Sequence, residues 1–151
     1  MDFLPVAIRI KNILVVGGGK VATHKATILH RFTDHVTVVA PQISEELRKL
    51  PFRFIERQFE DADLDDVQLV FVCTGSQAVN HHIKAVADRY DVLASVCDDS
   101  DWCDFISPAI SRQEGDNLTI AVGSDAKDVR RSIRVRNRIN ELIKNKVLDI
   151  S

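Results

Sequence analysis

The stretch Asn12-Ile-Leu-Val-Val-Gly-Gly-Gly-Lys-Val-Ala22 decides the fold of this chain. Its apolar run, which ends at Val16, is typical of a short strand that is buried on both faces of a parallel sheet. Glycines follow the run, and a helical pattern over residues 20–32 then places small residues such as Ala22 and Ala26 on one stripe. A buried strand, a glycine turn and a helix in this order form the first half of a βαβ unit.

The glycine turn has the pattern G-x-G-x-x-A, from Gly17 to Ala22. Directly after a buried strand and at the start of a helix, this pattern predicts a turn that binds a dinucleotide. Gly17 allows the tight turn, Gly19 lets the backbone approach a pyrophosphate, and Ala22 lets the helix pack closely on the sheet. The phosphates are expected over the helix N-terminus, where free amide groups and the helix dipole attract anions. The alternative is a glycine turn in an α/β protein that binds no nucleotide.

The rest of the chain continues to alternate strands with helices. Strands are expected at 35–40, 52–57, 67–73 and 92–97, helices at 44–50 and 78–90, a hairpin of 105–111 with 118–122, and a helix from 127 to the end. Alternating strands and helices indicate βαβ units with right-handed crossovers. The prediction is therefore an α/β fold, with a Rossmann-like, mostly parallel sheet, flanking helices, a C-terminal hairpin and a basic helix.

Composition excludes several other classes of protein. The chain has 151 residues, of which 45% are hydrophobic and 28% charged, as in an ordinary globular domain. Its net charge of −2 gives no basis for electrostatic binding of nucleic acid. Its apolar runs are far shorter than the roughly 20 residues of a membrane span. The chain opens without a leader pattern and has three cysteines, so we expect a cytoplasmic protein with reduced, buried thiols and no metal site.

Basic residues are concentrated near the C-terminus. Residues 127–146 contain eight basic side chains and two acidic ones. This helix could bind an anionic partner or form a docking surface, or the charges could simply face solvent. Its apolar stripe exceeds what one small domain is expected to cover, which predicts a homodimer.

The second strand lacks a residue that is common in dinucleotide-binding folds. An acidic residue usually ends this strand and binds the adenosine ribose. Here the strand ends Val38-Val-Ala-Pro41, without a carboxylate, so the backbone or Gln42 would have to hold the ribose. No arginine follows to hold a 2′-phosphate, which favours NAD over NADP.

Further motifs extend the pattern over most of the chain. In chain order they are Phe3-Leu-Pro5, Val15-Val-Gly-Gly-Gly-Lys-Val-Ala22 with Lys25, Val36-Thr-Val-Val-Ala-Pro41, Thr74 with Val79-Asn80, Ser95-Val-Cys-Asp-Asp99 and Cys103-Asp-Phe-Ile-Ser-Pro-Ala109. With these motifs the chain resembles the NAD-dependent precorrin-2 dehydrogenases of sirohaem biosynthesis, including the N-terminal part of multifunctional sirohaem synthases. The resemblance keeps order and spacing from residue 3 to about residue 124.

The resemblance implies oxidation of precorrin-2 to sirohydrochlorin with hydride transfer to NAD, and iron insertion into the product in bifunctional relatives. It implies that Asp98 is the catalytic aspartate and that Ser124 lies near the tetrapyrrole. Cofactor contacts fall on the glycine turn (Gly17, Gly19, Lys20, Val21, Ala22), on Pro41 and Gln42, and, as hydrogen-bonding partners of the nicotinamide side, on Thr74 and Asn80. Because the substrate is a polycarboxylate, Arg130 and Arg131 of the basic helix are candidates to bind it.

Each of these residues also has a structural alternative. Asp98 follows a strand at its carboxyl end, where ligands bind in open sheets, and a carboxylate there can remove a proton. The same segment, 98–104, could instead be a polar turn. Thr74 and Asn80 could cap the following helix, a role that is also open to Ser76. The five histidines are expected to be solvated side chains without a metal.

Two departures from the family pattern keep other functions open. Where the family usually has S-G-G-x-S-P, this chain has Ser124-Asp-Ala-Lys-Asp-Val129. The helical region after residue 124 is also shorter than in the family, which suggests an NAD-binding domain over 1–124 and a shortened C-terminal helix over 125–151. The leading hypothesis is the dehydrogenase. The alternatives are a non-catalytic, NAD-binding regulatory or redox-sensing domain, and a chelatase that uses the same pocket without net oxidation.

Overall fold

The computed structural model describes residues 2–97 and 99–151, so Asp98, the expected catalytic aspartate, lies outside the described residues. The described chain forms two compact units. One comprises residues 6–105, and the other joins residues 106–151 to the N-terminal residues up to Pro5. Each unit is described by itself.

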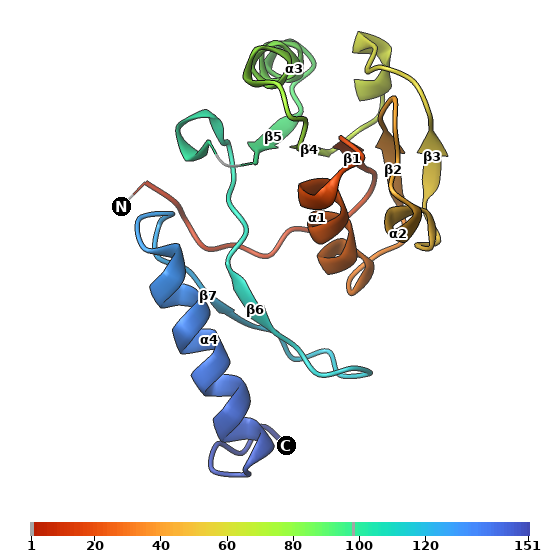
Figure 1. Cartoon of the computed structure of the whole chain (residues 1–151). Coiled ribbons are helices and arrows are strands. Elements are labelled where there is room, and N and C mark those ends of the chain that lie inside the picture. Colours follow the sequence, from red (N-terminus) through yellow and green to blue (C-terminus); the bar gives the residue numbers. More distant parts are fainter. Residues whose placement is uncertain (1, 98) are drawn as a thin grey trace. The chain divides into compact units, whose positions relative to one another are not determined.

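The unit of residues 6–105 is built on a five-stranded parallel sheet in the order β3-β2-β1-β4-β5 (Figure 1). The strands are β1 (Ile13–Val16), β2 (Val36–Val39), β3 (Arg53–Ile55), β4 (Leu69–Val72) and β5 (Leu93–Val96). In the register, Val16 lies opposite both Val39 and Val72, and Val72 lies opposite Val96. The strands therefore end together at one edge, the carboxyl edge. The chain reverses its direction of progress at β1, which is the arrangement of a Rossmann-like fold and confirms the predicted class.

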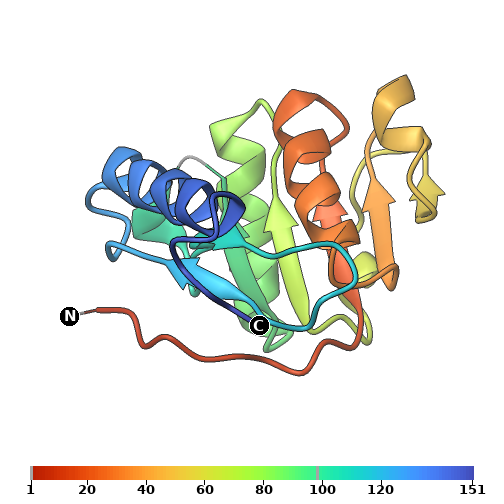
Figure 2. The same cartoon turned by 90° about the horizontal axis from the view of Figure 1, so that it is seen from below.

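Side chains alternate between two apolar layers along each strand. Leu14 and Val16 of β1 face the layer that contains Ile83 and Val86 of α3 (Gln77–Arg89). Ile13 and Val15 face the other layer, with Ala22 and Ala26 of α1 (Lys20–His30) and Leu47 of α2 (Glu45–Arg48). Figure 2 shows the helices on both sides of the sheet. This double cover explains why the strands read as continuous apolar runs.

The predicted elements of this unit are confirmed with small shifts at their ends. Two short 3-10 helices, η1 (Asp61–Leu64) and η2 (Ser100–Trp102), were not predicted. No helix in the described part of the chain is long and apolar enough to cross a membrane.

The cysteines differ from the expectation of three reduced thiols. A disulfide joins Cys73 to Cys97, whose Cα atoms lie 5.2 Å apart. The two residues directly follow the register pair Val72 and Val96, so the parallel pairing of β4 with β5 places them side by side. Of the three, Cys103 is a free thiol.

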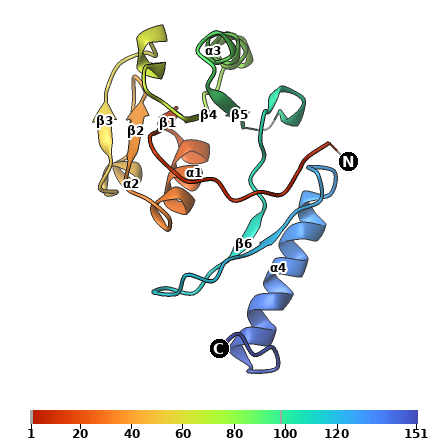
Figure 3. The ribbon, with the colours of Figure 1, turned by 180° about the vertical axis from the view of Figure 1, so that it is seen from behind.

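The second unit contains the predicted hairpin and basic helix. β6 (Ala109–Ser111) pairs antiparallel with β7 (Ile120–Val122), and α4 (Val129–Lys144) lies along this hairpin (Figure 3). Ser111 donates a hydrogen bond to Asn140, and Arg136 donates one to the carbonyl oxygen of Ile110 at 3.2 Å. The helix was expected to run to the end of the chain. It instead ends at Lys144, because Lys146 adopts a left-handed backbone conformation (φ 57°).

Candidate nucleotide-binding site

The glycine turn connects β1 to α1 at the carboxyl edge, and its first two residues can only be glycine. Gly17 has φ 131°, and a Cβ there would lie 2.3 Å from the carbonyl oxygen of Cys73. A Cβ on Gly18 would lie 1.9 Å from the carbonyl oxygen of Gln42. Such contacts are impossible without moving the backbone. The role predicted for Gly17 in the tight turn fits this geometry, whereas Gly18, the variable position of the motif, was not singled out.

Gly19 has a different environment, because a Cβ there would meet no atom of the described residues within 4 Å. It is the N-cap residue of α1, and as a glycine it has no side chain to cap this helix end. The first turn of α1 contains no acidic residue, and Lys20 and Val21 are exposed. Uncapped amide groups beside open space at a helix N-terminus suit a phosphate group, so the residues present fit a dinucleotide pyrophosphate.

The segment after β2 packs against the glycine turn. The amide of Ser44 donates to the carbonyl oxygen of Gly18 at 2.9 Å, and the Ser44 hydroxyl lies 3.0 Å from that of Thr23 in α1. Ser44 also accepts a hydrogen bond from Leu47, which confirms it as the cap of α2. Pro41 and Gln42 are exposed on this segment. The structure thus brings them together with the glycine turn, as the sequence led us to expect.

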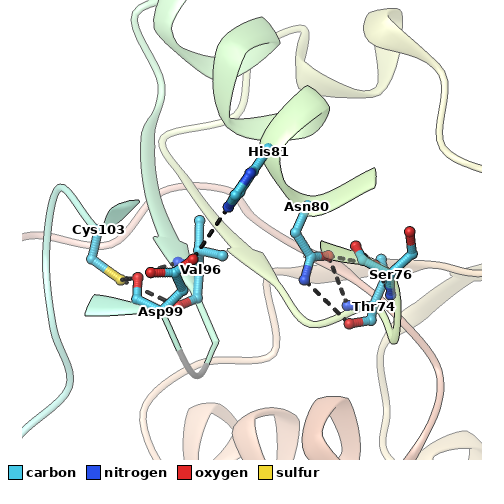
Figure 4. Close-up of polar contacts among 7 residues, drawn as sticks. All are labelled: Thr74, Ser76, Asn80, His81, Val96, Asp99 and Cys103. Atoms are coloured by element: carbon cyan, nitrogen blue, oxygen red, sulfur yellow. Dashed lines mark hydrogen bonds and ion pairs between the residues drawn. The ribbon is translucent and has the colours of Figure 1, made fainter. Parts of the chain in front are cut away.

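The turn between β4 and α3 is held by Asn80, which is 8% exposed (Figure 4). Asn80 Oδ1 accepts hydrogen bonds from the hydroxyl and the amide of Thr74, and its Nδ2 donates to the carbonyl oxygen of Thr74 at 3.2 Å. Ser76 caps α3 by accepting from the amide of Val79 at 3.3 Å. The Asn80 amide is therefore engaged in shaping this turn, while Thr74 lies at the carboxyl edge, directly after Cys73.

The loop after β5 carries a second set of polar contacts. His81 of α3 points toward this loop, and its Nε2 lies 3.2 Å from Asp99 Oδ2 (Figure 4). The His81 ring stacks on Trp102, with ring centroids 3.6 Å apart and planes 9° from parallel. His81 is half-buried, so the expectation that it is simply solvated is wrong. Sequence reasoning missed it because the partners are 18 and 21 residues away and lie on another element.

Two further side chains fasten this loop. Cys103 Sγ donates to the carbonyl oxygen of Val96 at 3.3 Å and accepts from its amide at 3.2 Å. Lys84 of α3 forms ion pairs with Asp88 and with Asp104. Burial lowers the pKa of the Lys84 ammonium group, but the two carboxylates raise it by more, so the net pKa is above its usual value. Neither Lys84 nor Asp104 was a predicted site residue.

The remaining predicted residues belong to the second unit. Ser124 Oγ accepts a hydrogen bond from the amide of Asp128 at 3.1 Å, and the Ser124 carbonyl oxygen accepts from Lys127 at 3.0 Å. Between them, Asp125 and Ala126 have φ of 54° and 62°. These are the positions at which the family pattern has glycine. Arg130 and Arg131 are exposed in the first turn of α4.

Another hollow lies apart from these residues. A cavity of about 540 Å³ is lined by residues of β1, β2, β3 and η1, among them Asp63, and by Arg57 between β3 and η1. It includes none of the predicted site residues. Within the described residues, no group of three or more His, Cys, Asp or Glu side chains is placed to hold a metal ion.

Comparison with known proteins agrees with this geometry. Residues 4–109 match the family described as "Putative NAD(P)-binding". The chain belongs to this family. The match spans β1 to β5 and ends at the first residue of β6, so it includes the glycine turn, the Thr74 turn and the loop after β5.

Similar proteins carry more specific names. The chain is 34% identical over 142 residues to the siroheme synthase of Thioalkalivibrio sulfidiphilus and 36% identical over 140 residues to that of Tolumonas auensis, with 90% of this chain covered in each case. It spans only 29% and 30% of those proteins. Among solved structures it resembles SirC, precorrin-2 dehydrogenase, with a TM-score of 0.75 and 25% identity over 92% of this chain and 70% of that one.

Proposed function

We propose that this chain oxidises precorrin-2 to sirohydrochlorin with NAD as the hydride acceptor, as part of sirohaem synthesis in the cytoplasm. The observation that carries the proposal is the similarity to SirC, precorrin-2 dehydrogenase, over 92% of the chain. The siroheme synthases match over 90% of this chain and agree with the same pathway. The uncapped N-terminus of α1 beside Gly19 supplies the phosphate site that such an enzyme needs.

In this proposal the carboxyl edge binds the cofactor. The amides after Gly19 bind the pyrophosphate, with Lys20 and Val21 beside them. The adenosine lies toward Pro41 and Gln42, and the nicotinamide lies toward Thr74. NAD, when bound, supplies the carbon that accepts the hydride. The segment after β2 offers no cationic side chain for a 2′-phosphate, which supports NAD over NADP.

The remaining residues act on the substrate. Oxidation removes a hydride and a proton, and a carboxylate at position 98 would take the proton. Ser124 Oγ accepts a hydrogen bond from the amide of Asp128. The hydroxyl proton of Ser124 can therefore donate a hydrogen bond to a substrate carboxylate. Arg130 and Arg131 would bind further carboxylates through paired N–H groups.

The test uses the full chain, freshly generated precorrin-2 and either NAD or NADP under anaerobic conditions. We expect sirohydrochlorin and reduced cofactor to appear together in absorbance spectra, and faster with NAD. A chain that binds NAD but produces no sirohydrochlorin contradicts the proposal. Adding Fe²⁺ or Co²⁺ to preformed sirohydrochlorin, with and without protein, tests whether the chain also inserts a metal.

A non-catalytic, NAD-binding regulatory domain is the second candidate. One observation favours it: Asp125 adds a carboxylate beside Ser124, where an anionic substrate would be repelled. In that case NAD binding is retained and turnover is absent, and replacing Asp125 by glycine does not restore it. If Asp125→Gly instead lowers the KM for precorrin-2, the dehydrogenase is supported.

A further inference from the structure

The last two carbonyl groups of the glycine turn accept hydrogen bonds from different parts of the chain. The carbonyl oxygen of Gly19 accepts from the amide of Thr23 at 2.9 Å and from the Thr23 hydroxyl at 2.7 Å. The carbonyl oxygen of Gly18 accepts from the amide of Ser44 at 2.9 Å. The peptide groups that follow Gly18 and Gly19 are therefore held by α1 and by the segment after β2.

The hydroxyl groups of Ser44 and Thr23 form a chain of hydrogen bonds with a defined direction. Thr23 is buried, and its single hydroxyl proton is donated to Gly19, so Ser44 is the donor in the 3.0 Å contact between the two hydroxyls. Ser44 Oγ in turn accepts a hydrogen bond from the amide of Leu47 in α2 at 3.1 Å. The chain thus runs from α2 to the Gly19 carbonyl. Hydrogen bonds in such a chain strengthen one another.

These hydrogen bonds also determine where the neighbouring amides point. A trans peptide group is planar, with its N–H and its C=O directed to opposite sides. Holding the carbonyl groups of Gly18 and Gly19 therefore holds the amides of Gly19 and Lys20, which belong to the same peptide groups. Both amides precede Thr23, whose amide donates the hydrogen bond that begins the intrahelical pattern of α1. They lie beside the open side of Gly19, where the proposed pyrophosphate binds.

We propose that Thr23 and Ser44 are positioning residues that orient the amides of Gly19 and Lys20 toward the pyrophosphate of NAD. The inference rests on the cofactor site of the proposed function. Neither hydroxyl touches the cofactor in this account. Both act through the Gly19 carbonyl, and donors that are already held in place bind a ligand more tightly, because less freedom is lost on binding.

The experiment compares Thr23→Val with Thr27→Val, its matched control. Valine keeps the branched shape of threonine, so each change removes chiefly a hydroxyl group. Both hydroxyls donate to the carbonyl oxygen four residues earlier, at 2.7 and 2.8 Å. The Thr23 hydroxyl reaches the glycine turn in this way, whereas the Thr27 hydroxyl bonds within the helix.

We expect Thr23→Val to weaken NAD binding by about three- to tenfold in calorimetric titration, the range for loss of one hydrogen bond. Thr27→Val should bind NAD with the parental affinity. Thr23→Ser, which restores the hydroxyl, should bind NAD nearly as tightly as the parent. The melting temperature of each variant controls for a general loss of stability.

Two further readouts separate positioning from a merely structural role. ADP contains a pyrophosphate but no nicotinamide, so its affinity for Thr23→Val should fall by the same factor as that of NAD. In the reaction, the KM for NAD should rise by a similar factor, while kcat at saturating NAD stays within about twofold of the parental value. A merely structural role would lower the melting temperature and leave these affinities unchanged.

Ser44→Ala tests the start of the hydrogen-bond chain. It removes the donor to Thr23 but keeps the Ser44 amide that bonds to Gly18, so NAD binding should weaken less than in Thr23→Val. The double variant should bind NAD about as tightly as Thr23→Val alone, because both changes act through the same carbonyl group. Losses that multiply in the double variant would overturn the chain as the route by which Ser44 acts.

The outcomes distinguish this inference from the proposed function. Parental affinities for NAD and ADP in Thr23→Val, equal losses in Thr27→Val, or a loss that Thr23→Ser does not restore would each overturn the inference. A parental chain that binds NAD without oxidising precorrin-2 overturns the proposed function alone, and the affinities of the variants still decide the inference. A parental chain that binds neither NAD nor ADP overturns the cofactor site and the inference with it.

Discussion

The three adjacent glycines of this chain differ in their steric surroundings. Gly17 and Gly18 are required because a Cβ would overlap the carbonyl oxygens of Cys73 and Gln42. Gly19 has an ordinary extended backbone, with φ −93° and ψ −155°, and open space beside it. No contact within the described chain therefore requires a glycine at position 19. The space beside it is where the proposed pyrophosphate binds.

Gly19→Val tests this assignment. The branched side chain would fill the phosphate space, so we expect the affinity for NAD to fall at least about tenfold, which corresponds to about 1.4 kcal/mol. The circular dichroism spectrum and melting temperature should stay close to the parental values. Thr27→Val, at an exposed position of the same helix, is the control. Parental NAD affinity in Gly19→Val, measured by calorimetric titration, would reject the site.

Asp98 and Asp99 give a second test at the residue scale. Asp98→Ala should slow oxidation by about 10²- to 10⁴-fold, the range for loss of a general base, and leave NAD binding nearly intact. Asp99→Ala should cost much less, because Asp99 faces His81 at 3.2 Å. Rates measured at saturating NAD compare the two. Similar rates for Asp98→Ala and the parent would refute the catalytic role.

At the scale of elements, the turn before α4 and the helix η1 affect stability in opposite directions. The turn before α4 places Ala126 in the left-handed region, where a Cβ is unfavourable. η1 is closed by a capping box in which Asp63 accepts the amide of Glu60 at 2.8 Å. Asp63 also accepts two hydrogen bonds from Arg57, at 2.7 and 2.8 Å. The turn before α4 is therefore strained, whereas η1 is stabilised by hydrogen bonds. The effect of each on the stability of the chain can be measured.

Ala126→Gly should relieve the strain before α4. We expect the free energy of unfolding to rise by about 0.5–1 kcal/mol, because glycine adopts positive φ without a steric cost. Ala85→Gly, at an exposed position inside α3, should lower it by a similar amount. Thermal unfolding measures both variants. A lower melting temperature for Ala126→Gly would contradict the left-handed conformation.

Asp63→Ala tests the capping box and its dependence on pH. Burial raises the pKa of Asp63, but hydrogen bonds from Arg57 and from the amide of Glu60 lower it by more, so the net pKa is below 3.8. The contribution of Asp63 to stability is therefore present above pH 3.8 and is lost as the pH falls through its folded-state pKa. We expect a loss of about 1 kcal/mol at pH 7, as for other caps, and a smaller difference near pH 3. Urea unfolding at the two pH values measures this, with the exposed Asp65→Ala as control.

The sequence predicted the elements whose patterns are local. The apolar runs, the glycine turn and the Ser44 cap could be found because each depends on neighbouring residues. The pairing of Cys73 with Cys97 depends on the register of β4 with β5, which no local pattern encodes. The contact of His81 with Trp102 joins α3 to the loop after β5, which are distant in sequence. Gly18 was missed because it is a variable position of the motif, whereas the requirement for glycine there comes from the carbonyl oxygen of Gln42, which is distant in sequence.

At the scale of the whole molecule, the chain has apolar surface on α4 that the described residues leave exposed. Val129, Ile133 and Val135 are 57%, 40% and 41% exposed. The chain spans less than a third of the two siroheme synthases compared above, so its oligomeric state has to be measured on this chain itself. The division of the chain into an NAD-binding domain over 1–124 and a C-terminal helix over 125–151 also stays a prediction.

We propose a homodimer that covers this surface of α4. Light scattering over the micromolar range should give twice the mass of 17.0 kDa. Ile133→Glu should shift the mass toward the monomer, because a charged side chain would be buried in the interface. The exposed change Arg138→Glu is a control for charge alone. A monomeric mass for the parental chain at every concentration would contradict the proposal.

The contrast among the three glycines bears on how relatives of this chain would diverge. A related protein that no longer bound the nucleotide would still need Gly17 and Gly18, because the fold itself requires glycine at these positions. Gly19 would be free to drift toward any residue. A relative with glycine at the positions of Gly17 and Gly18 but a large side chain at the position of Gly19 would therefore be expected to keep the fold without binding the nucleotide.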